Sequence, residues 1–186
     1  MMRCIDLLTI NRDFGEEDLV EVMWNALRYF PNELWEGINY IGNINIGYDF
    51  KINFRGEIYG AFLFKNLMEK IRRFKKIFEI ENTLVALTCE PVIVSHYRFE
   101  KGGFKRINNL VRDYMCEDLG IISLFKVDEE ISARIAAHGL GHSQGLPHHP
   151  EPIDLMYVGL LNGSILIEEG FCRECRVKLE RRATRT

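Results

Sequence analysis

Four of the five histidines of the chain lie within residues 138–149, whose sequence is His138-Gly-Leu-Gly-His142-Ser-Gln-Gly145-Leu-Pro-His148-His149. Two histidines four residues apart on a helix project from the same face, so His138 and His142 can bind one metal ion. Gly145 allows the chain to reverse after the helix and to bring His148 round as a third ligand. Three neutral imidazoles leave a tetrahedral zinc ion with one open position. This run therefore predicts an open zinc site at the end of a helix.

The helix that carries the histidines also contains Gly139 and Gly141. Glycine in a helix interior costs ~1 kcal/mol relative to alanine, so this segment needs a stabilising contact from outside the helix. A zinc ion bound across one turn is one such contact. The alternative is a histidine-rich helix end that binds no metal. The complete spacing, with a predicted strand before the helix, favours the metal site.

The composition is that of an ordinary globular protein of about one domain. Hydrophobic residues make up 47% of the 186 residues and charged residues 27%, with a formal net charge of -3. Such values exclude a disordered chain or a small disulfide scaffold, and the charge gives no general argument for nucleic acid or an anionic membrane. No apolar run approaches the ~18 residues of a membrane span. Asp6 interrupts the first apolar stretch, so we expect no secretory signal and a cytoplasmic protein.

The apolar spacing predicts strands and helices of a single mixed α/β domain spanning residues 1–186. Expected strands are 3–10, 48–54, 83–89 and 120–127, and expected helices are 16–30, 61–78, 107–115, 128–144 and 173–182. The acidic run Glu16-Glu17-Asp18 suits the first turn of a helix. The Gly/Asn-rich stretch 37–47 predicts loop and turn.

Five cysteines occur, and two of them are a closely spaced pair. Cys172 and Cys175 have the two-residue gap of a metal knuckle or a redox dithiol. Cys4, Cys89 and Cys116 lie in apolar surroundings and are interpreted as reduced core thiols. A redox role for the pair requires a βαβ setting that the sequence does not predict, so the alternatives are a metal site and a reduced surface dithiol.

The histidine run resembles the zinc signature of the metzincin peptidases, HExxHxxGxxH followed by a turn that contains methionine. Met156 lies eight residues after His148 and fits that Met-turn. Within the metzincins the chain is most similar to the archaemetzincins, over Gly120 to about Cys175. The resemblance implies a twisted mixed sheet with an antiparallel edge strand, an active-site helix within residues 1–145, and a small zinc-stapled subdomain at 146–186.

Gly139 is the first departure from the family pattern, because it stands where the family has its catalytic glutamate. That glutamate takes a proton from the attacking water and passes it to the leaving amine. Glycine can do neither, and losing a general acid/base typically costs ~10²–10⁴-fold in rate. Activity is therefore expected to be weak or lost, with Glu151 and Tyr157 as weak candidates to replace the glutamate.

The second departure concerns a second metal. At the two positions where archaemetzincins place their first pair of cysteines, the chain has His149 and Asp154. Imidazole and carboxylate are both competent zinc ligands. With Cys172 and Cys175 they make a closed set of four, so the resemblance implies a structural zinc and two zinc ions per chain.

The leading hypothesis is an archaemetzincin-like zinc metallopeptidase scaffold whose partner is a peptide or protein segment. By the resemblance, strand 120–126 is the antiparallel edge strand, to which an extended peptide can add through backbone hydrogen bonds; alternatively, a loop covers that edge. A second hypothesis is a non-catalytic zinc-binding protein that holds a peptide. A third is a zinc-binding nucleic-acid module, suggested by the cysteine pair and the basic tail, but the net charge argues against it, so we expect neither nucleic acid nor membrane as partner.

Overall fold

A computed structural model describes residues 3–12, 19–100, 102–116, 118–164 and 166–184. The larger of its sheets has five strands in the order β2-β1-β5-β9-β8. These strands are β1 (Arg3–Ile10), β2 (Trp35–Ile44), β5 (Thr83–Thr88), β8 (Asp113–Met115) and β9 (Leu119–Ser123). The pairings of β1 with β2, β1 with β5 and β5 with β9 are parallel, and β8 pairs antiparallel with β9. The short strand β8 is thus the antiparallel edge of a mixed sheet.

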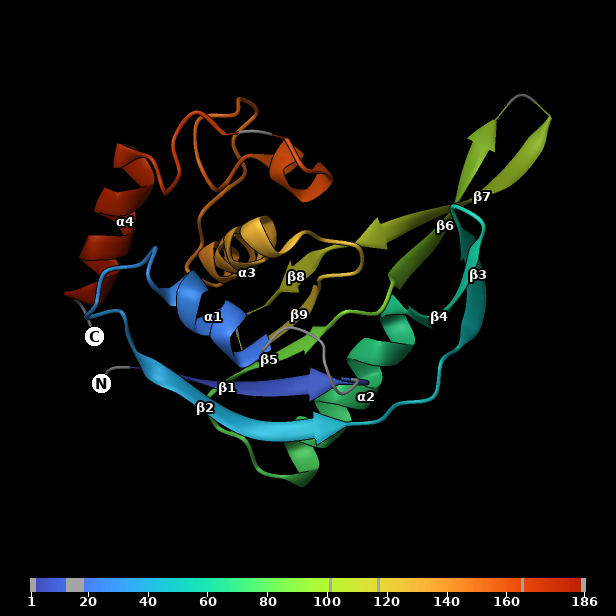
Figure 1. The fold of residues 1–186 in the computed structure, drawn as a ribbon, viewed down its shortest axis with the longest axis horizontal. Helices are drawn as coiled ribbons and strands as arrows, with labels where there is room; N and C mark the ends of the chain where they lie inside the picture. Colours follow the sequence, from blue (N-terminus) through green and yellow to red (C-terminus); the bar gives the residue numbers. More distant parts are fainter. Residues whose placement is uncertain (1–2, 13–18, 101, 117, 165, 185–186) are drawn as a thin grey trace.

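Helices cover both faces of the larger sheet (Figure 1). Helices α1 (Leu19–Leu27) and α3 (Glu129–Ser143) share one hydrophobic core with Leu7 and Ile122, whereas α2 (Phe64–Ile77) shares another with Leu8 and Ile121. Neighbouring residues of a strand point to opposite faces, so strands buried on both sides become nearly continuous apolar runs. This is why β1, β5 and β9 were recognisable in the sequence.

The second sheet has the order β3-β4-β6-β7, with β3 (Phe50–Phe54), β4 (Glu57–Leu63), β6 (Val92–Glu100) and β7 (Gly103–Val111). Strands β6 and β7 form a long hairpin that projects from the rest of the molecule (Figure 1). Strand β7 continues through Arg112 into β8. The chain therefore passes from the hairpin to the free edge of the larger sheet, close to α3.

After α3 the chain forms the short 3-10 helix η1 (Val158–Asn162) and the helix α4 (Arg173–Ala183). Phe171 and Leu179 from this region join the core that α1 and α3 share. In Figure 1 this region, coloured orange to red, lies on the same side of the larger sheet as α1 and α3. None of the helices in the described ranges is both long and apolar enough to cross a membrane.

The mixed α/β class is confirmed, with two corrections to the expected elements. Residues 37–47 are not mainly loop, because β2 runs to Ile44. Gly37 and Gly42 have positive φ angles and lie at register shifts of the β1–β2 pairing, so they permit bulges in a strand that looks like a loop in sequence. Residues 107–115 are not a helix: they belong to β7 and β8, whose partners β6 and β9 impose the extended form. The acidic run at 16–18 lies outside the described residues.

A third correction concerns the edge of the sheet. We expected strand 120–126 to be the antiparallel edge, but β9 lies between β5 and β8 and pairs parallel with β5. The antiparallel edge strand is β8, whose residues fall within the segment 107–115 that the sequence pattern predicts as a helix. The three cysteines interpreted as core thiols, Cys4, Cys89 and Cys116, are half-buried, whereas Cys172 and Cys175 are buried.

Candidate metal centres

Helix α3 ends in the turn that the sequence predicts. The amide of Leu146 donates to the Gly141 carbonyl at 3.1 Å and the amide of Gly145 to the His142 carbonyl at 2.8 Å, while Gly145 has a φ of 72°. This pair of bonds with a left-handed glycine is a Schellman motif, which ends the helix and reverses the chain. The reversal carries His148 back toward the last two turns of α3.

The structure brings His138, His142 and His148 together. Their Nε2 atoms lie 3.1 Å apart for His138 and His142, 3.2 Å for His138 and His148, and 3.0 Å for His142 and His148. These three nitrogens form a nearly equilateral triangle whose size suits three ligands of one tetrahedral ion. Side-chain exposure rises from 0% at His138 to 23% at His142, and His148 is exposed, so the cluster opens to solvent on one side.

Two of these rings are oriented by backbone carbonyls. Nδ1 of His138 donates to the Leu155 carbonyl at 2.6 Å, and Nδ1 of His142 donates to the Leu146 carbonyl at 3.0 Å. A carbonyl only accepts, so in the neutral rings the proton is on Nδ1 and the lone pair is on Nε2. Lone pairs that converge on one point repel each other unless a cation lies between them. The donor set of this cluster therefore fits a zinc ion.

The electrostatics favour the neutral form of two of the three rings, those of His138 and His148. Burial lowers the pKa of His138 to about 4. Burial and the neighbouring rings lower the pKa of His148. Neutral imidazole is the form that binds a metal, so these two rings offer their lone pairs near neutral pH.

A carboxylate from the edge strand faces the same cluster. Oδ2 of Asp113, in β8, lies 4.0 Å from Nε2 of His138 and 3.9 Å from Nε2 of His142, and its side chain is only 6% exposed. Burial raises the pKa of Asp113, and the charges of His142 and His148 act against that shift. A Cβ atom added at Gly139 would lie 3.4 Å from Cβ of Asp113. Asp113 thus approaches the histidines across the position where the family glutamate would begin.

Gly141 is explained by packing beneath the cluster. A Cβ atom there would lie 2.6 Å from Sδ of Met156 and 3.3 Å from the ring of Phe171. Met156 is fully buried and is the residue assigned to the Met-turn. The missing side chain at Gly141 thus makes room for Met156 under the histidine-bearing turn.

The structure gathers a second set of ligand atoms from His149, Asp154, Cys172 and Cys175, all within 4.8 Å of one another. Sγ of Cys175 lies 3.7 Å from Nε2 of His149. Asp154 and Cys175 are fully buried, and the side chain of His149 is 13% exposed. This cluster has four candidate ligands and little access to solvent, which is the pattern of a closed structural site.

One atom of this cluster lacks a proper partner among the described residues. Nδ1 of His149 is buried and lies 2.9 Å from Oδ1 of Asp154, but it is not aligned to donate a hydrogen bond to it. A buried nitrogen without a partner costs free energy, and a cation bound between Nδ1 and the carboxylate would remove that cost. The residues of the second cluster therefore also fit a zinc ion.

Asp154 additionally ties two segments together. Its oxygens accept hydrogen bonds of 2.9 Å from the amides of Met156 and Cys172. Burial acts to raise the pKa of Asp154, but these hydrogen bonds outweigh it and the pKa is lowered. Burial, with the nearby Asp154 and Cys172, raises the pKa of the Cys175 thiol. Asp154 thus connects the turn at Met156 to the first residue before α4.

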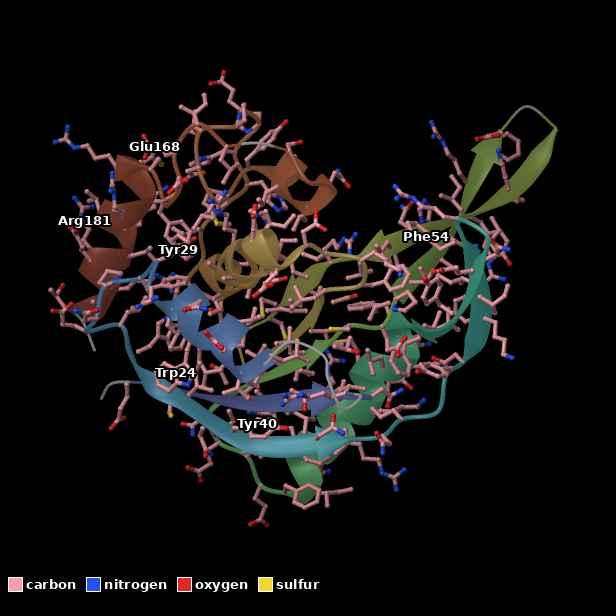
Figure 2. The ribbon with its side chains drawn as sticks, in the orientation of Figure 1. Trp24, Tyr29, Tyr40, Phe54, Glu168 and Arg181 are labelled. Atoms are coloured by element: carbon pink, nitrogen blue, oxygen red, sulfur yellow. The ribbon has the colours of Figure 1, made fainter. Side chains whose placement is uncertain are left out.

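A cavity of about 360 Å³ lies between the first turns of helix α3, the 3-10 helix η1 and the end of β3. It is lined by Arg112, next to Asp113, by Ile135, one turn before His138, and by residues of η1. Phe54, labelled at the end of β3 in Figure 2, lines another wall and packs edge-on against Phe125 with 5.4 Å between ring centroids. Residues of the second sheet, of α3 and of η1 line the cavity, and its walls mix apolar side chains with the charged groups of Arg55, Arg112, Lys126 and Asp128.

The two residues named as weak replacements for the glutamate, Glu151 and Tyr157, remain predictions. Glu151 is exposed, and the ring of Tyr157 packs over Gly159. In the described part of the chain neither is hydrogen-bonded or ion-paired with the three histidines. Sequence reasoning missed Asp113, because it assigned residues 107–115 to a helix. One feature of the sequence could have directed the search to it: because Gly139 leaves the position of the glutamate empty, a carboxylate from another element could take its place.

Neither a protein-family model nor a curated protein matches the sequence. Among solved structures, the fold is similar to that of an archaemetzincin from Methanopyrus kandleri, with a TM-score of 0.63 and 19% identity over 98% of this chain and 96% of that one. It is also similar to a zinc-dependent peptidase from Methanocorpusculum labreanum, with a TM-score of 0.53 and 19% identity over 94% of this chain and 99% of that one. The chain thus has the archaemetzincin fold, as its zinc motif predicts.

Proposed function

We propose that the chain is a zinc metallopeptidase of the archaemetzincin type. The observation that carries this proposal is the convergence of three Nε2 atoms within 3.0–3.2 Å at the open end of α3. A zinc ion held there would polarise a peptide carbonyl and acidify a water molecule. The likeness of the fold to an archaemetzincin and to a zinc-dependent peptidase supports the same reaction class.

The protein's own residues have distinct roles in this proposal. His138, His142 and His148 hold the metal, and the carbonyls of Leu155 and Leu146 fix the first two rings. Met156 supports the turn below them. The cavity next to Arg112 and Ile135 is the proposed space for a substrate side chain, and the free edge of β8 is the proposed site for the extended peptide backbone.

The second cluster is proposed as a structural zinc site of His149, Asp154, Cys172 and Cys175, giving two zinc ions per chain. Its place between the turn at Met156 and the start of α4 supports a role in holding residues 146–186 as a small subdomain. Because all four candidate positions are taken by side chains, this zinc takes no part in hydrolysis.

The competing function is a zinc-binding protein that holds a peptide without cleaving it, and it is favoured by Gly139. One experiment separates the two. Zinc-loaded protein is incubated with a broad peptide library, alone, after removal of metal by a chelator and after zinc is restored. Cleavage that disappears with the chelator and returns with zinc, and that is absent in His142→Ala, supports a peptidase. An inert zinc-loaded protein that still retains peptides supports the binding protein.

A further inference from the structure

Asp113 is a buried carboxylate that faces the three-histidine cluster without belonging to its proposed ligand set. The β8–β9 pairing opposite Ile122 turns its side chain toward α3, whereas the ring of its neighbour Tyr114 packs on Phe64. The carboxylate is nearly enclosed, with Oδ2 3.9–4.0 Å from two of the Nε2 atoms. The carboxyl group thus lies in contact with the proposed site although it comes from a different element of the fold.

The distances place this carboxylate beside the ligand set instead of within it. The three Nε2 atoms are 3.0–3.2 Å from one another, whereas Oδ2 is 3.9–4.0 Å from the nitrogens of His138 and His142. A fourth tetrahedral ligand would be as close to each nitrogen as the nitrogens are to each other. An oxygen just outside the set of three nitrogens is placed to exchange a proton with a water molecule or substrate at the fourth, open position of the metal.

Position 139 lies close enough to Asp113 that a long side chain there would compete with it for space. A Cβ atom at Gly139 would lie 3.4 Å from Cβ of Asp113 and 3.4 Å from the nearest atom of Ile122. A longer side chain at 139 would have to extend through the space that Asp113 and Ile122 occupy. A glutamate on α3 and an aspartate on β8 are therefore alternative ways to bring one carboxylate to the cluster.

We propose that Asp113 is the general acid/base of this site and replaces the glutamate that Gly139 lacks. The inference rests on the proposed peptidase function. Oδ2 accepts a proton from the attacking water as its oxygen bonds to the peptide carbonyl carbon. The same proton is then donated to the amide nitrogen as the C–N bond breaks, so that one water is consumed, one acid and one amine are formed, and Asp113 regains its starting state.

The test compares six zinc-loaded proteins: the wild type, Asp113→Asn, Asp113→Ala, Gly139→Glu, Asp113→Ala/Gly139→Glu, and Asp118→Asn. Asp118 pairs with Lys75 at an exposed surface and provides the matched control. Two quantities are measured for each protein. One is the kcat for a peptide selected from the library, and the other is the dissociation constant of zinc at the three-histidine site, by competition with a chromophoric chelator. Unchanged zinc affinity also shows that a variant is folded at the site.

Wild-type hydrolysis is expected, with kcat about 10²–10⁴-fold lower in Asp113→Asn and Asp113→Ala and zinc affinity unchanged. The double variant should recover hydrolysis, because alanine vacates the space that the new glutamate needs. Gly139→Glu alone should not exceed the wild type, since two carboxylates would compete for that space. Asp118→Asn should match the wild type in both measurements.

The opposite outcomes separate the two proposals. If the wild type cleaves peptides and Asp113→Asn cleaves them equally well, the role of Asp113 is wrong and the peptidase function stands. If Asp113→Ala loses zinc, the residue is a ligand and not an acid/base. If the wild type is inert but the double variant is active, the site is competent and Asp113 does not serve it. If both are inert, the peptidase function fails together with Asp113.

Discussion

His148 and His149 are neighbours in sequence, yet they belong to two clusters of opposite character. The first cluster has three nitrogen donors on a helix end and its turn, and it opens to solvent at His148. The second mixes nitrogen, oxygen and sulfur donors from three segments, with Asp154 and Cys175 fully buried. An open site with three ligands suits chemistry, whereas a closed site with four suits folding. The chain reversal after α3 supplies one histidine to each cluster, and the start of α4 completes the second with its two cysteines.

The largest effect on stability is expected from breaking the closed cluster. Cys175→Ser removes a buried ligand and leaves Asp154, His149 and Cys172 around an incomplete site. We expect the free energy of unfolding to fall by more than ~4 kcal/mol, because the zinc that joins the Met156 turn to α4 is lost. Chemical denaturation measures it. Cys116→Ser, at a half-buried thiol between β8 and β9, is the control, and an equal loss in both variants would contradict a structural zinc.

Breaking the open cluster should abolish hydrolysis and have only a small effect on stability. His142→Ala removes one of three ligands and the hydrogen bond to Leu146. Hydrolysis should fall to background, while the free energy of unfolding changes by only ~2 kcal/mol. Peptide cleavage and denaturation are measured on the same preparation. A variant that unfolds as completely as Cys175→Ser would show that the open cluster is also structural.

The residues of the site that could be predicted from the sequence are those that lie close to one another along the chain. The three histidines fall within eleven residues and one turn, so helix spacing and Gly145 suffice to bring them together. The cysteine pair is equally local, and the resemblance to a known family added His149 and Asp154. Asp113 lies 25 residues before His138, on a strand whose conformation is set by pairing with β9, and no local pattern carries that information.

The same distinction holds for the fold. Strands buried on both faces, such as β1, β5 and β9, have apolar runs that mark them in the sequence. The sequence pattern does not indicate strand β2, because the glycines at its bulges, Gly37 and Gly42, are typical of loops. It does not indicate β8, because that strand has only three residues. Residues whose conformation depends on a distant partner were the ones assigned wrongly.

The two helix glycines offer a sharper test of packing near the open cluster. Gly141→Ala would place Cβ 2.6 Å from Sδ of Met156 and should destabilise the protein by ~1–3 kcal/mol through overpacking. Gly139→Ala makes only ordinary contacts at 3.4 Å and should be neutral or stabilising by up to ~1 kcal/mol through helix propensity. Thermal unfolding of the two variants measures the difference. Equal effects would contradict the packing of Met156 against the helix.

A smaller effect is expected from pH in the metal-free protein. Burial lowers the pKa of His138 from 6.5 to about 4. Between pH 6.5 and pH 4 the unfolded chain therefore binds more protons at His138 than the folded chain does. The free energy of unfolding is then highest above about pH 6.5 and falls as the pH is lowered toward 4. Asp113 acts in the opposite sense, because burial raises its pKa. Denaturation between these pH values should therefore show a steeper loss in Asp113→Asn than in the wild type. A rise in stability on acidification of Asp113→Asn would contradict the neutral, buried His138.

The zinc content per chain, measured by elemental analysis after gel filtration, tests the two-cluster account most directly. The account predicts two zinc ions in the wild type, one in His142→Ala and one in Cys175→Ser, with hydrolysis retained only where the three-histidine cluster is intact and the protein folded. A wild type with a single zinc ion, or the loss of both ions in His142→Ala, would contradict two independent sites of different kinds.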